Sequence, residues 1–338
     1  MFKYESNTDL ANIAALVADA GRIVVTTHAK PDGDAIGSAM SIRRALGDRV
    51  DVLLMGPVPS AIRLIAGSTP WIDASQQMPE SGEDLVLVVD TGAYSQVEQV
   101  APWLRERQDR IIVLDHHASG DDMGGLRWVD TKAASCTLVM MDLLDTMGLP
   151  ITGGPESVAE ALFCGLATDT GWFRFSNADS RAFAAASRLL EIGVDRDGLY
   201  RTIEETARPT RLALQARAMQ SLELLHDDRC ALMSLHPRDF KETGGNQGEL
   251  AGTVNIPMEI ASVECSVLLC SEGDAETKIS FRSKPPKRAG GPFVDASALA
   301  RQLGGGGHVH AAGARVAGPI DVARDRILEV TSELGATE

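Results

Sequence analysis

The feature that most constrains the fold of this 338-residue chain is a short apolar run that recurs in its first half and ends each time at polar side chains. The three runs occupy residues 22–27, 85–89 and 110–114. They are short and rich in β-branched residues, which is typical of buried parallel strands. Stretches with helical spacing of apolar residues, such as 36–46, lie between them. Strands that alternate with helices predict an α/β fold with a parallel sheet.

Polar residues follow each of these predicted strands directly. They are His28 after the first run, Asp90 after the second and the triplet Asp115, His116 and His117 after the third. In open parallel sheets, ligands bind beyond the carboxyl ends of the strands. We therefore expect the functional site of the first domain at this edge of the sheet.

The pattern of predicted helices and strands changes along the rest of the chain. Residues from about 133 to 188 have the pattern of helices, whereas residues 229–316 alternate short predicted strands with glycine-rich loops. We expect a domain boundary near residues 190–210. The predicted parts are an N-terminal parallel-sheet domain with flanking helices over residues 1–195, a helical connector over 196–225, and a smaller α/β substrate-binding domain over 226–338, across a cleft from the first.

The densest group of candidate metal ligands is the segment from His28 to Asp34. A strand delivers the imidazole of His28, a turn containing Pro and Gly presents the carboxylates of Asp32 and Asp34, and a helix begins there. Oxygen and imidazole ligands suit Mn²⁺ or Fe²⁺, and the lack of thiolate ligands disfavours structural zinc. The alternative is an aspartate that caps a helix in a surface turn.

Further candidates are Asp90, His116, His117 and Asp169, of which the last follows a predicted helix. Asp90 by itself could be a helix N-cap. The adjacent side chains of His116 and His117 cannot point the same way if strand geometry continues, so one could bind a metal while the other faces the substrate. If each of these residues had a separate structural role, several residues suited to binding a metal would follow predicted strands and helices only by coincidence. The pattern therefore favours one shared metal centre.

In their order and spacing, these residues resemble the four-motif signature of the DHH phosphoesterase superfamily. The glycine-rich segment Gly304–Gly313 resembles the motif of the C-terminal domain associated with that family. Two preceding segments, 253–255 and 278–284, resemble those of its nanoRNase and pAp-phosphatase branch. The resemblance covers roughly residues 20–316.

The resemblance implies a cofactor of two Mn²⁺ ions, or other divalent metals, and assigns their ligands. One metal would be held by His28, Asp32 and Asp90, and the other by Asp34, Asp90, His116 and Asp169. Asp90 would bridge the two. Of the remaining catalytic residues, His117 would lie in the outer shell near the phosphate and Asp115 would orient a histidine.

The second domain is expected to select the substrate, because basic residues gather there. Between Lys278 and Arg315 the local charge is +6, so the rest of the chain carries −21. Arg282 and His308 are the best candidate anchors for a phosphate or carboxylate, and arginine suits bidentate phosphate contacts.

Three further features are candidates for binding the substrate. Residues Gly305, Gly306 and Gly307 would allow backbone N–H groups to approach an anion closely, although a mobile interdomain linker is the alternative. Asn255 lies in one of the segments that carry the resemblance. Ser135, at a predicted helix start, could support an anion site, and helix capping is the alternative there.

The resemblance implies an enzyme that hydrolyses very short RNA or DNA oligonucleotides, of two to five nucleotides, to mononucleotides. It could also convert 3′-phosphoadenosine 5′-phosphate (pAp) to AMP. One alternative is a hydrolase of linear dinucleotides (pApA or pGpG) acting after cyclic-dinucleotide opening. A second is an inorganic pyrophosphatase, against which the segment Gly304–Gly313 counts. A third, from a different class, is a non-catalytic nucleotide-sensing module.

The net charge of −15 argues against binding to long duplex nucleic acid or anionic membranes, which requires many cationic contacts. An acidic outer surface would instead favour short substrates. No run approaches 18 apolar residues, and the first residues lack the pattern of a signal peptide. Five cysteines without a CxxC pair indicate a reduced, cytoplasmic setting. A homodimer formed through the first domain is compatible with this interpretation.

Overall fold

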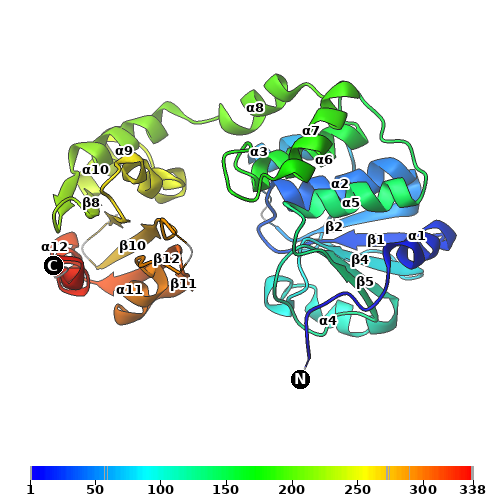
Figure 1. The fold of residues 1–338 in the computed structure, drawn as a ribbon, viewed down its shortest axis with the longest axis horizontal. Helices are drawn as coiled ribbons and strands as arrows, with labels where there is room; N and C mark the ends of the chain where they lie inside the picture. Colours follow the sequence, from blue (N-terminus) through cyan, green and yellow to red (C-terminus); the bar gives the residue numbers. More distant parts are fainter. Residues whose placement is uncertain are drawn as a thin grey trace. The chain divides into compact units, whose positions relative to one another are not determined.

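The computed structural model describes residues 2–56, 58, 60–271, 273, 275–288 and 290–335. The chain divides into two compact units, Met1–Thr206 and Ala207–Glu338 (Figure 1). Each unit contains a six-stranded sheet with helices packed on it. The α/β fold class predicted from the sequence is therefore confirmed.

The sheet of the first unit is parallel throughout, with strand order β3-β2-β1-β4-β5-β6. Its strands are β1 (Ile23–Thr26), β2 (Val50–Leu54), β3 (Ile72–Asp73), β4 (Leu85–Val89), β5 (Ile111–Asp115) and β6 (Leu126–Val129). The strand order reverses between β1 and β4, which pair directly. In open α/β sheets such a switch point is where ligands bind.

Helices cover both faces of this sheet. They are α1 (Leu10–Asp19), α2 (Gly33–Leu46), α3 (Ser60–Ala66), α4 (Ala101–Arg105), α5 (Cys136–Thr146), α6 (Val158–Asp169), α7 (Ser180–Glu191) and α8 (Arg196–Glu204). Successive residues of β4 face opposite layers, as strand geometry requires. Leu87 lies in the core beneath α2, α5 and α6, whereas Val86 and Val88 lie in the core with Leu104 of α4 (Figure 1).

Helices α2 and α6 approach each other closely because glycines lie at their contact. A Cβ at Gly37 would collide with the carbonyl oxygen of Ala161 and lie 3.1 Å from the backbone nitrogen of Gly165. Asp34 lies in the first turn of α2, and Asp169 is the last residue of α6. The small residues thus bring together two helices that each carry a predicted ligand.

The sheet of the second unit is mixed, with order β11-β12-β10-β9-β8-β7. Its strands are β7 (Glu223–Leu225), β8 (Cys230–Leu235), β9 (Cys265–Cys270), β10 (Glu276–Ser283), β11 (Gly306–His308) and β12 (Ala311–Ala317). Its helices are α9 (Pro209–Gln220), α10 (Pro237–Thr243), α11 (Ala296–Gln302) and α12 (Ile320–Val330). Leu268 of β9 packs with α9 and α10, and Val267 packs with α11 and α12, so this sheet is also covered on both faces.

The segment 196–225, expected as a connector, is divided between the two units. Helix α8 belongs to the first unit, where it contacts α3, and α9 belongs to the second, where it contacts β8 and α10. The five cysteines are buried free thiols. Among the described residues, no helix is long and apolar enough to cross a membrane.

Candidate metal centre

The six predicted metal ligands converge at the carboxyl edge of the parallel sheet. His28 follows β1, Asp90 follows β4 and His116 follows β5. Asp32 is the N-cap of α2 and Asp34 lies in its first turn, while Asp169 is the last residue of α6. Their donor atoms form two groups in which all members lie within 4.8 Å of one another: His28, Asp32 and Asp90, and Asp34, His116 and Asp169.

In the first group, the imidazole of His28 faces two carboxylates. Its Nε2 lies 3.5 Å from Oδ2 of Asp90 and 3.9 Å from Oδ1 of Asp32. Its Nδ1 lies 3.0 Å from the carbonyl oxygen of Ala29. A carbonyl oxygen can only accept, so Nδ1 carries the proton, and Nε2 is left as the atom that faces the carboxylates.

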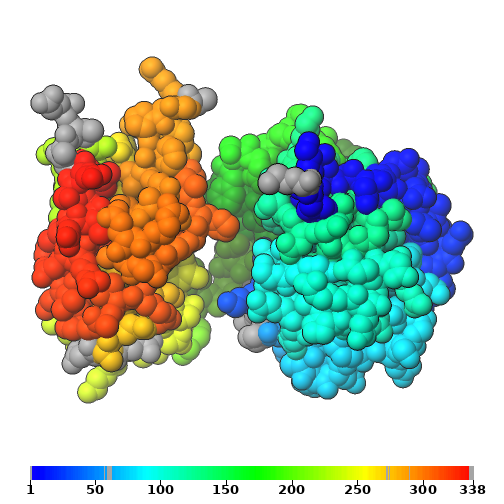
Figure 2. Space-filling view, turned by 90° about the horizontal axis from the view of Figure 1, so that it is seen from below, coloured from blue at the N-terminus to red at the C-terminus, as the bar shows by residue number. Residues whose placement is uncertain are grey.

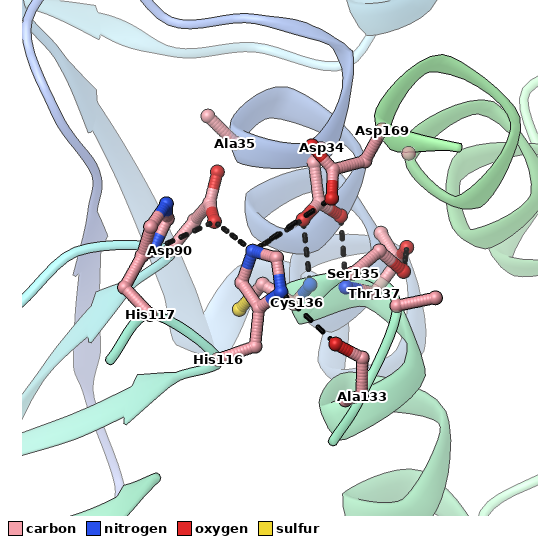
Figure 3. A network of polar contacts seen from close by, with 12 residues as sticks. Asp34, Ala35, Asp90, His116, His117, Ala133, Ser135, Cys136, Thr137 and Asp169 are labelled. Atoms are coloured by element: carbon pink, nitrogen blue, oxygen red, sulfur yellow. Dashed lines mark hydrogen bonds and ion pairs between the residues drawn. The ribbon is translucent and has the colours of Figure 1, made fainter. Parts of the chain in front are cut away.

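In the second group, His116 has the same arrangement. Its Nδ1 lies 3.2 Å from the carbonyl oxygen of Ala133, and its Nε2 lies 3.7 Å from Oδ2 of Asp34 and 3.9 Å from Oδ2 of Asp169 (Figure 3). The same Nε2 lies 3.4 Å from Oδ1 of Asp90. The two oxygens of Asp90 therefore face the two groups, one oxygen to each.

Asp90 has two properties that fit a bound cation. It is 2% exposed, and its Oδ1 has no hydrogen-bond partner among the described residues. A buried carboxylate oxygen that accepts no hydrogen bond is costly, and a cation, either the protonated imidazole of His116 at 3.4 Å or a metal ion, would satisfy it. The backbone of Asp90 also adopts φ = 60°, a left-handed conformation that few residues other than glycine adopt. Strained backbone conformations of this kind are enriched at active sites.

Asp34 is held by the N-terminus of α5. The N–H groups of Cys136 and Thr137 donate to its two oxygens at 2.5 and 2.9 Å (Figure 3). Burial, together with the nearby charges of Asp90 and Asp169, nevertheless raises the pKa of Asp34 well above its usual value. Burial and neighbouring carboxylates likewise raise the pKa of Asp169 to about 6. These carboxylates require nearby positive charge to remain ionised together.

The histidines supply part of that positive charge. Burial alone would lower the pKa of His28, but its interaction with Asp90 outweighs burial and raises the pKa to about 9. Asp90 and Asp34 raise the pKa of His116 to about 10 against the same effect of burial. Protons on these imidazoles occupy the positions that a metal would take. The donor set of carboxylate oxygens and imidazole nitrogens fits divalent cations such as Mn²⁺.

Asp115 and His117 form a pair beside the two groups. Oδ1 of Asp115 accepts hydrogen bonds from Nδ1 of His117 at 2.8 Å and from the N–H groups of His116 and His117 at 2.8 and 3.2 Å. The imidazoles of His116 and His117 lie edge to face, with ring centroids 4.5 Å apart and an angle of 62° between their planes. The side chain of His117 is 50% exposed, whereas that of His116 is 12% exposed. His117 is thus open to a substrate, and its Nδ1 is occupied by Asp115.

Two residues also have the capping roles that the sequence left open. Oδ1 of Asp32 accepts from the N–H groups of Asp34 and Ala35, so this residue caps α2 and also belongs to the first ligand group. Ser135 is fully buried, and its hydroxyl accepts from the N–H of Leu138 at the start of α5. The hydroxyl thus has the capping role, and the carboxylate of Asp34 lies at the same helix terminus. A role of Ser135 in binding a substrate anion stays a prediction.

In the second unit, Arg282 is half-buried on β10 and lines a cavity of about 260 Å³. Burial lowers its pKa, and no carboxylate lies within ion-pair distance of it among the described residues. Lys278 and Ser280 line the same cavity because alternate residues of a strand share one face. The sequence did not single out these two residues as binding candidates, although they precede Arg282 by four and two positions and so share its face of the strand. A half-buried cation of this kind suits an anionic ligand.

The glycine-rich segment belongs to the sheet. Residues 306–308 pair with β12, so the alternative of a mobile interdomain linker is excluded. A Cβ at Gly305 or Gly307 would collide with the backbone of β12, which gives these glycines a packing role. Gly306 faces open space and His308 is exposed on the same edge strand. Asn255 is exposed on a 3₁₀ segment, Thr253–Glu259, next to β10.

A parallel sheet with two groups of carboxylate and imidazole donors at its switch point, and with one oxygen of Asp90 facing each group, is typical of metal-dependent hydrolases. Family comparisons agree with this class. The model of the DHH family N-terminal domain matches residues 22–166, and that of the DHHA1 domain matches residues 230–334.

Relatives of known name cover nearly the whole chain. The chain is 30% identical over 320 residues to the bifunctional oligoribonuclease and PAP phosphatase NrnA of Thermus thermophilus, which covers 94% of this chain and 91% of that protein. It is 26% identical to the NrnA of Bacillus subtilis, over 87% of this chain and 89% of that protein. The chain therefore belongs to the DHH family of phosphoesterases.

A further relative and a solved structure are also similar to this chain. The cyclic-di-AMP phosphodiesterase PdeA of Listeria monocytogenes is 26% identical over 87% of this chain, but the match covers only 44% of that protein. The crystal structure of an exopolyphosphatase-related protein from Bacteroides fragilis superposes with a TM-score of 0.85 and 24% identity over 99% of both chains. This last similarity shows that the two proteins share a fold.

Proposed function

We propose that this protein is a metal-dependent phosphoesterase that hydrolyses very short oligonucleotides to mononucleotides and also converts pAp to AMP. The observation that carries the proposal is the position of Asp90 at the switch point of the sheet, where its Oδ2 faces His28 and its Oδ1 faces His116 of the second group. The names of the relatives from Thermus thermophilus and Bacillus subtilis support the substrate class.

The metal centre in this proposal contains two Mn²⁺ ions. His28, Asp32 and Asp90 would hold one ion, and Asp34, Asp90, His116 and Asp169 the other. Two bound cations lower the pKa of water and stabilise charge on phosphate oxygens. The chain supplies four ligand carboxylates, which nearly balance the charge of two divalent cations before the substrate binds.

The other residues of the chain bind and orient the substrate. His117 is half-exposed beside the ligand groups and its Nδ1 is fixed by Asp115, so Nε2 of the doubly protonated imidazole can donate to a phosphate oxygen. Arg282, with Lys278 beside it, would hold a second anionic group of the substrate, and His308, Gly306 and Asn255 would contribute weaker contacts. In this proposal, the metal centre and His117 act in turnover, and the residues of the second unit act in substrate binding.

A second candidate function is the hydrolysis of linear dinucleotides such as pApA. The similarity to the cyclic-di-AMP phosphodiesterase of Listeria monocytogenes favours it, since that protein acts on a related dinucleotide. Both candidate activities would use the same metal centre.

We also propose that the protein acts in the cytoplasm, as a homodimer formed through the first unit.

A substrate panel tests the proposal. Purified protein with Mn²⁺ is incubated with a 5-mer RNA, pApA, pAp and pyrophosphate, and the products are separated by chromatography. The proposal expects mononucleotides from the 5-mer and AMP from pAp. Turnover of pApA alone would favour the second candidate, and hydrolysis of none of the four at micromolar enzyme would refute both.

The acidity of the chain further predicts a preference for short substrates. Outside residues 278–315 the chain carries a charge of −21, which would repel a long polyanion more strongly than a short one. A 3-mer should therefore be cleaved faster than a 24-mer, and added salt should reduce the difference. Equal rates for the two lengths would contradict this explanation.

A further inference from the structure

Tyr4 contacts the candidate metal centre although it lies outside every motif of the sequence. It precedes α1, and its hydroxyl donates a 2.5 Å hydrogen bond to Oδ2 of Asp115, 111 positions along the chain. The segment around it is fixed along β6, since the N–H of Asn7 donates to the carbonyl oxygen of Arg127 and the N–H of Val129 donates to the hydroxyl of Ser6. Figure 2 shows this segment, in dark blue, lying against the first unit.

The ring of Tyr4 occupies a space that two glycines leave open. A Cβ at Gly92, two residues after Asp90, or at Gly120, three residues after His117, would collide with the ring. Neither glycine has a positive φ, so backbone conformation does not require glycine at these positions. Glycine is needed at both positions because a larger residue would occupy the space that the ring of Tyr4 fills.

The hydrogen bonds of Asp115 show what this contact does. Its side chain is fully buried, and Oδ1 accepts the three donors described above, including Nδ1 of His117. Among the described residues, Tyr4 supplies the hydrogen bond to Oδ2. Four donors match the capacity of an ionised carboxylate. Without the hydroxyl of Tyr4, Oδ2 would be buried and unpaired, and the carboxylate would gain by rotating or admitting water.

We propose that Tyr4 is a positioning residue for His117: it fixes the carboxylate of Asp115, which in turn fixes the orientation of the imidazole and keeps the proton on Nδ1. The effect on turnover rests on the proposed function, in which His117 contacts the substrate phosphate. The effect on the imidazole itself does not depend on that function. Outer residues that orient site histidines are known to matter in this way.

The first test is the kinetics of Tyr4→Phe. Because outer-shell changes typically cost about 10- to 100-fold in activity, we expect kcat on a short oligonucleotide to fall about 10-fold with KM nearly unchanged. In a His117→Ala background, Tyr4→Phe should have no further effect. Ser6→Ala is the matched control, since it removes a contact of the same segment, and it should retain wild-type kinetics. An equal loss from Tyr4→Phe in both backgrounds would refute the positioning role.

A second variant and a second measurement separate this inference from the proposed function. Gly120→Ala should displace the ring of Tyr4 and reproduce the kinetic effect of Tyr4→Phe, while a fully active Gly120→Ala would refute the role. In ¹⁵N NMR spectra of the seven histidines, recorded at a pH where His117 is neutral, this residue should carry its proton on Nδ1 in the wild type and lose this preference in Tyr4→Phe. An unchanged His117 signal would refute the inference. The NMR result stands even if no substrate is hydrolysed, an outcome that would refute the proposed function alone.

Discussion

The proposal that Asp90 is a ligand shared by two metal ions predicts how metal binding should stabilise the protein. The ligand oxygens of Asp34 and Asp169 lie within 4.8 Å of each other. At an effective dielectric constant of about 20, two unit charges at that distance repel by about 3.5 kcal/mol. Metal ions would remove this repulsion in the folded protein only, so Mn²⁺ should raise the melting temperature of the first unit.

The expected shift follows from linkage. At a metal concentration of about 100 times Kd the stabilisation is about 2.7 kcal/mol. For a unit of about 200 residues this corresponds to about 5–11 °C. Asp90→Asn keeps the side-chain volume, and asparagine tolerates the left-handed backbone, but the variant loses the shared charge. If its metal affinity falls about 100-fold, the stabilisation drops to about 0.4 kcal/mol.

Differential scanning calorimetry with EDTA and with Mn²⁺ measures both values. The unfolding transition of the first unit should shift in the wild type and hardly move in Asp90→Asn. Asp145→Asn is the control, because Asp145 pairs with Arg188 on the surface away from the ligand groups. Its shift should equal that of the wild type. An undiminished Mn²⁺ shift in Asp90→Asn would refute the assignment of a shared ligand.

Three further predictions concern packing, pH and substrate binding. Gly37→Ala should destabilise the first unit by about 1–3 kcal/mol in chemical denaturation, because the added methyl group has no room between α2 and α6; unchanged stability would contradict the described helix contact. A backbone hydrogen bond and Arg107 lower the pKa of Glu83 in the folded protein, although burial opposes this. Glu83 therefore stabilises the fold at pH values above the pKa that it has in the unfolded chain. This stabilisation is lost as the pH falls through its pKa in the folded protein. Glu83→Gln should therefore cost about 1.5–3 kcal/mol at pH 7, and the difference from the wild type should shrink in acid; a constant difference would refute this account. Arg282→Ala should raise KM for a short oligonucleotide about 10-fold or more with little change in kcat, and Arg324→Ala, on α12 in the same unit, should leave both unchanged; equal affinity of the Arg282 variant and the wild type would contradict the anchor.

Much of the catalytic half of the molecule could be predicted because its signals are local. The strand over residues 85–89 has the predicted bounds, since an apolar β-branched run between polar residues has few alternatives. The helix predicted over residues 36–46 begins three residues earlier, at Gly33, because Asp32 caps it. The convergence of the ligands followed from the general rule that the carboxyl ends of parallel strands share one edge.

The parts that could not be predicted depend on long-range contacts or backbone conformation. The pairing of β1 with both β2 and β4 is set by packing in the folded chain, which no local pattern encodes. The left-handed conformation of Asp90 has no signature in its residue type. Ser135 was expected at a helix start, but its complete burial depends on the tertiary structure around α5. The contact of Tyr4 with Asp115 joins residues with no related motif.

The central claim is that the metal centre around Asp90 hydrolyses short oligonucleotides. The most direct measurement is the release of mononucleotides from a labelled trinucleotide by wild-type protein and by Asp90→Asn, each with Mn²⁺ and with excess EDTA. We expect steady release by the wild type with Mn²⁺ only, and release about 100- to 1000-fold slower, as when a group that stabilises the transition state is removed, by the folded variant. Release that persists in EDTA, or that Asp90→Asn retains, would contradict the central claim.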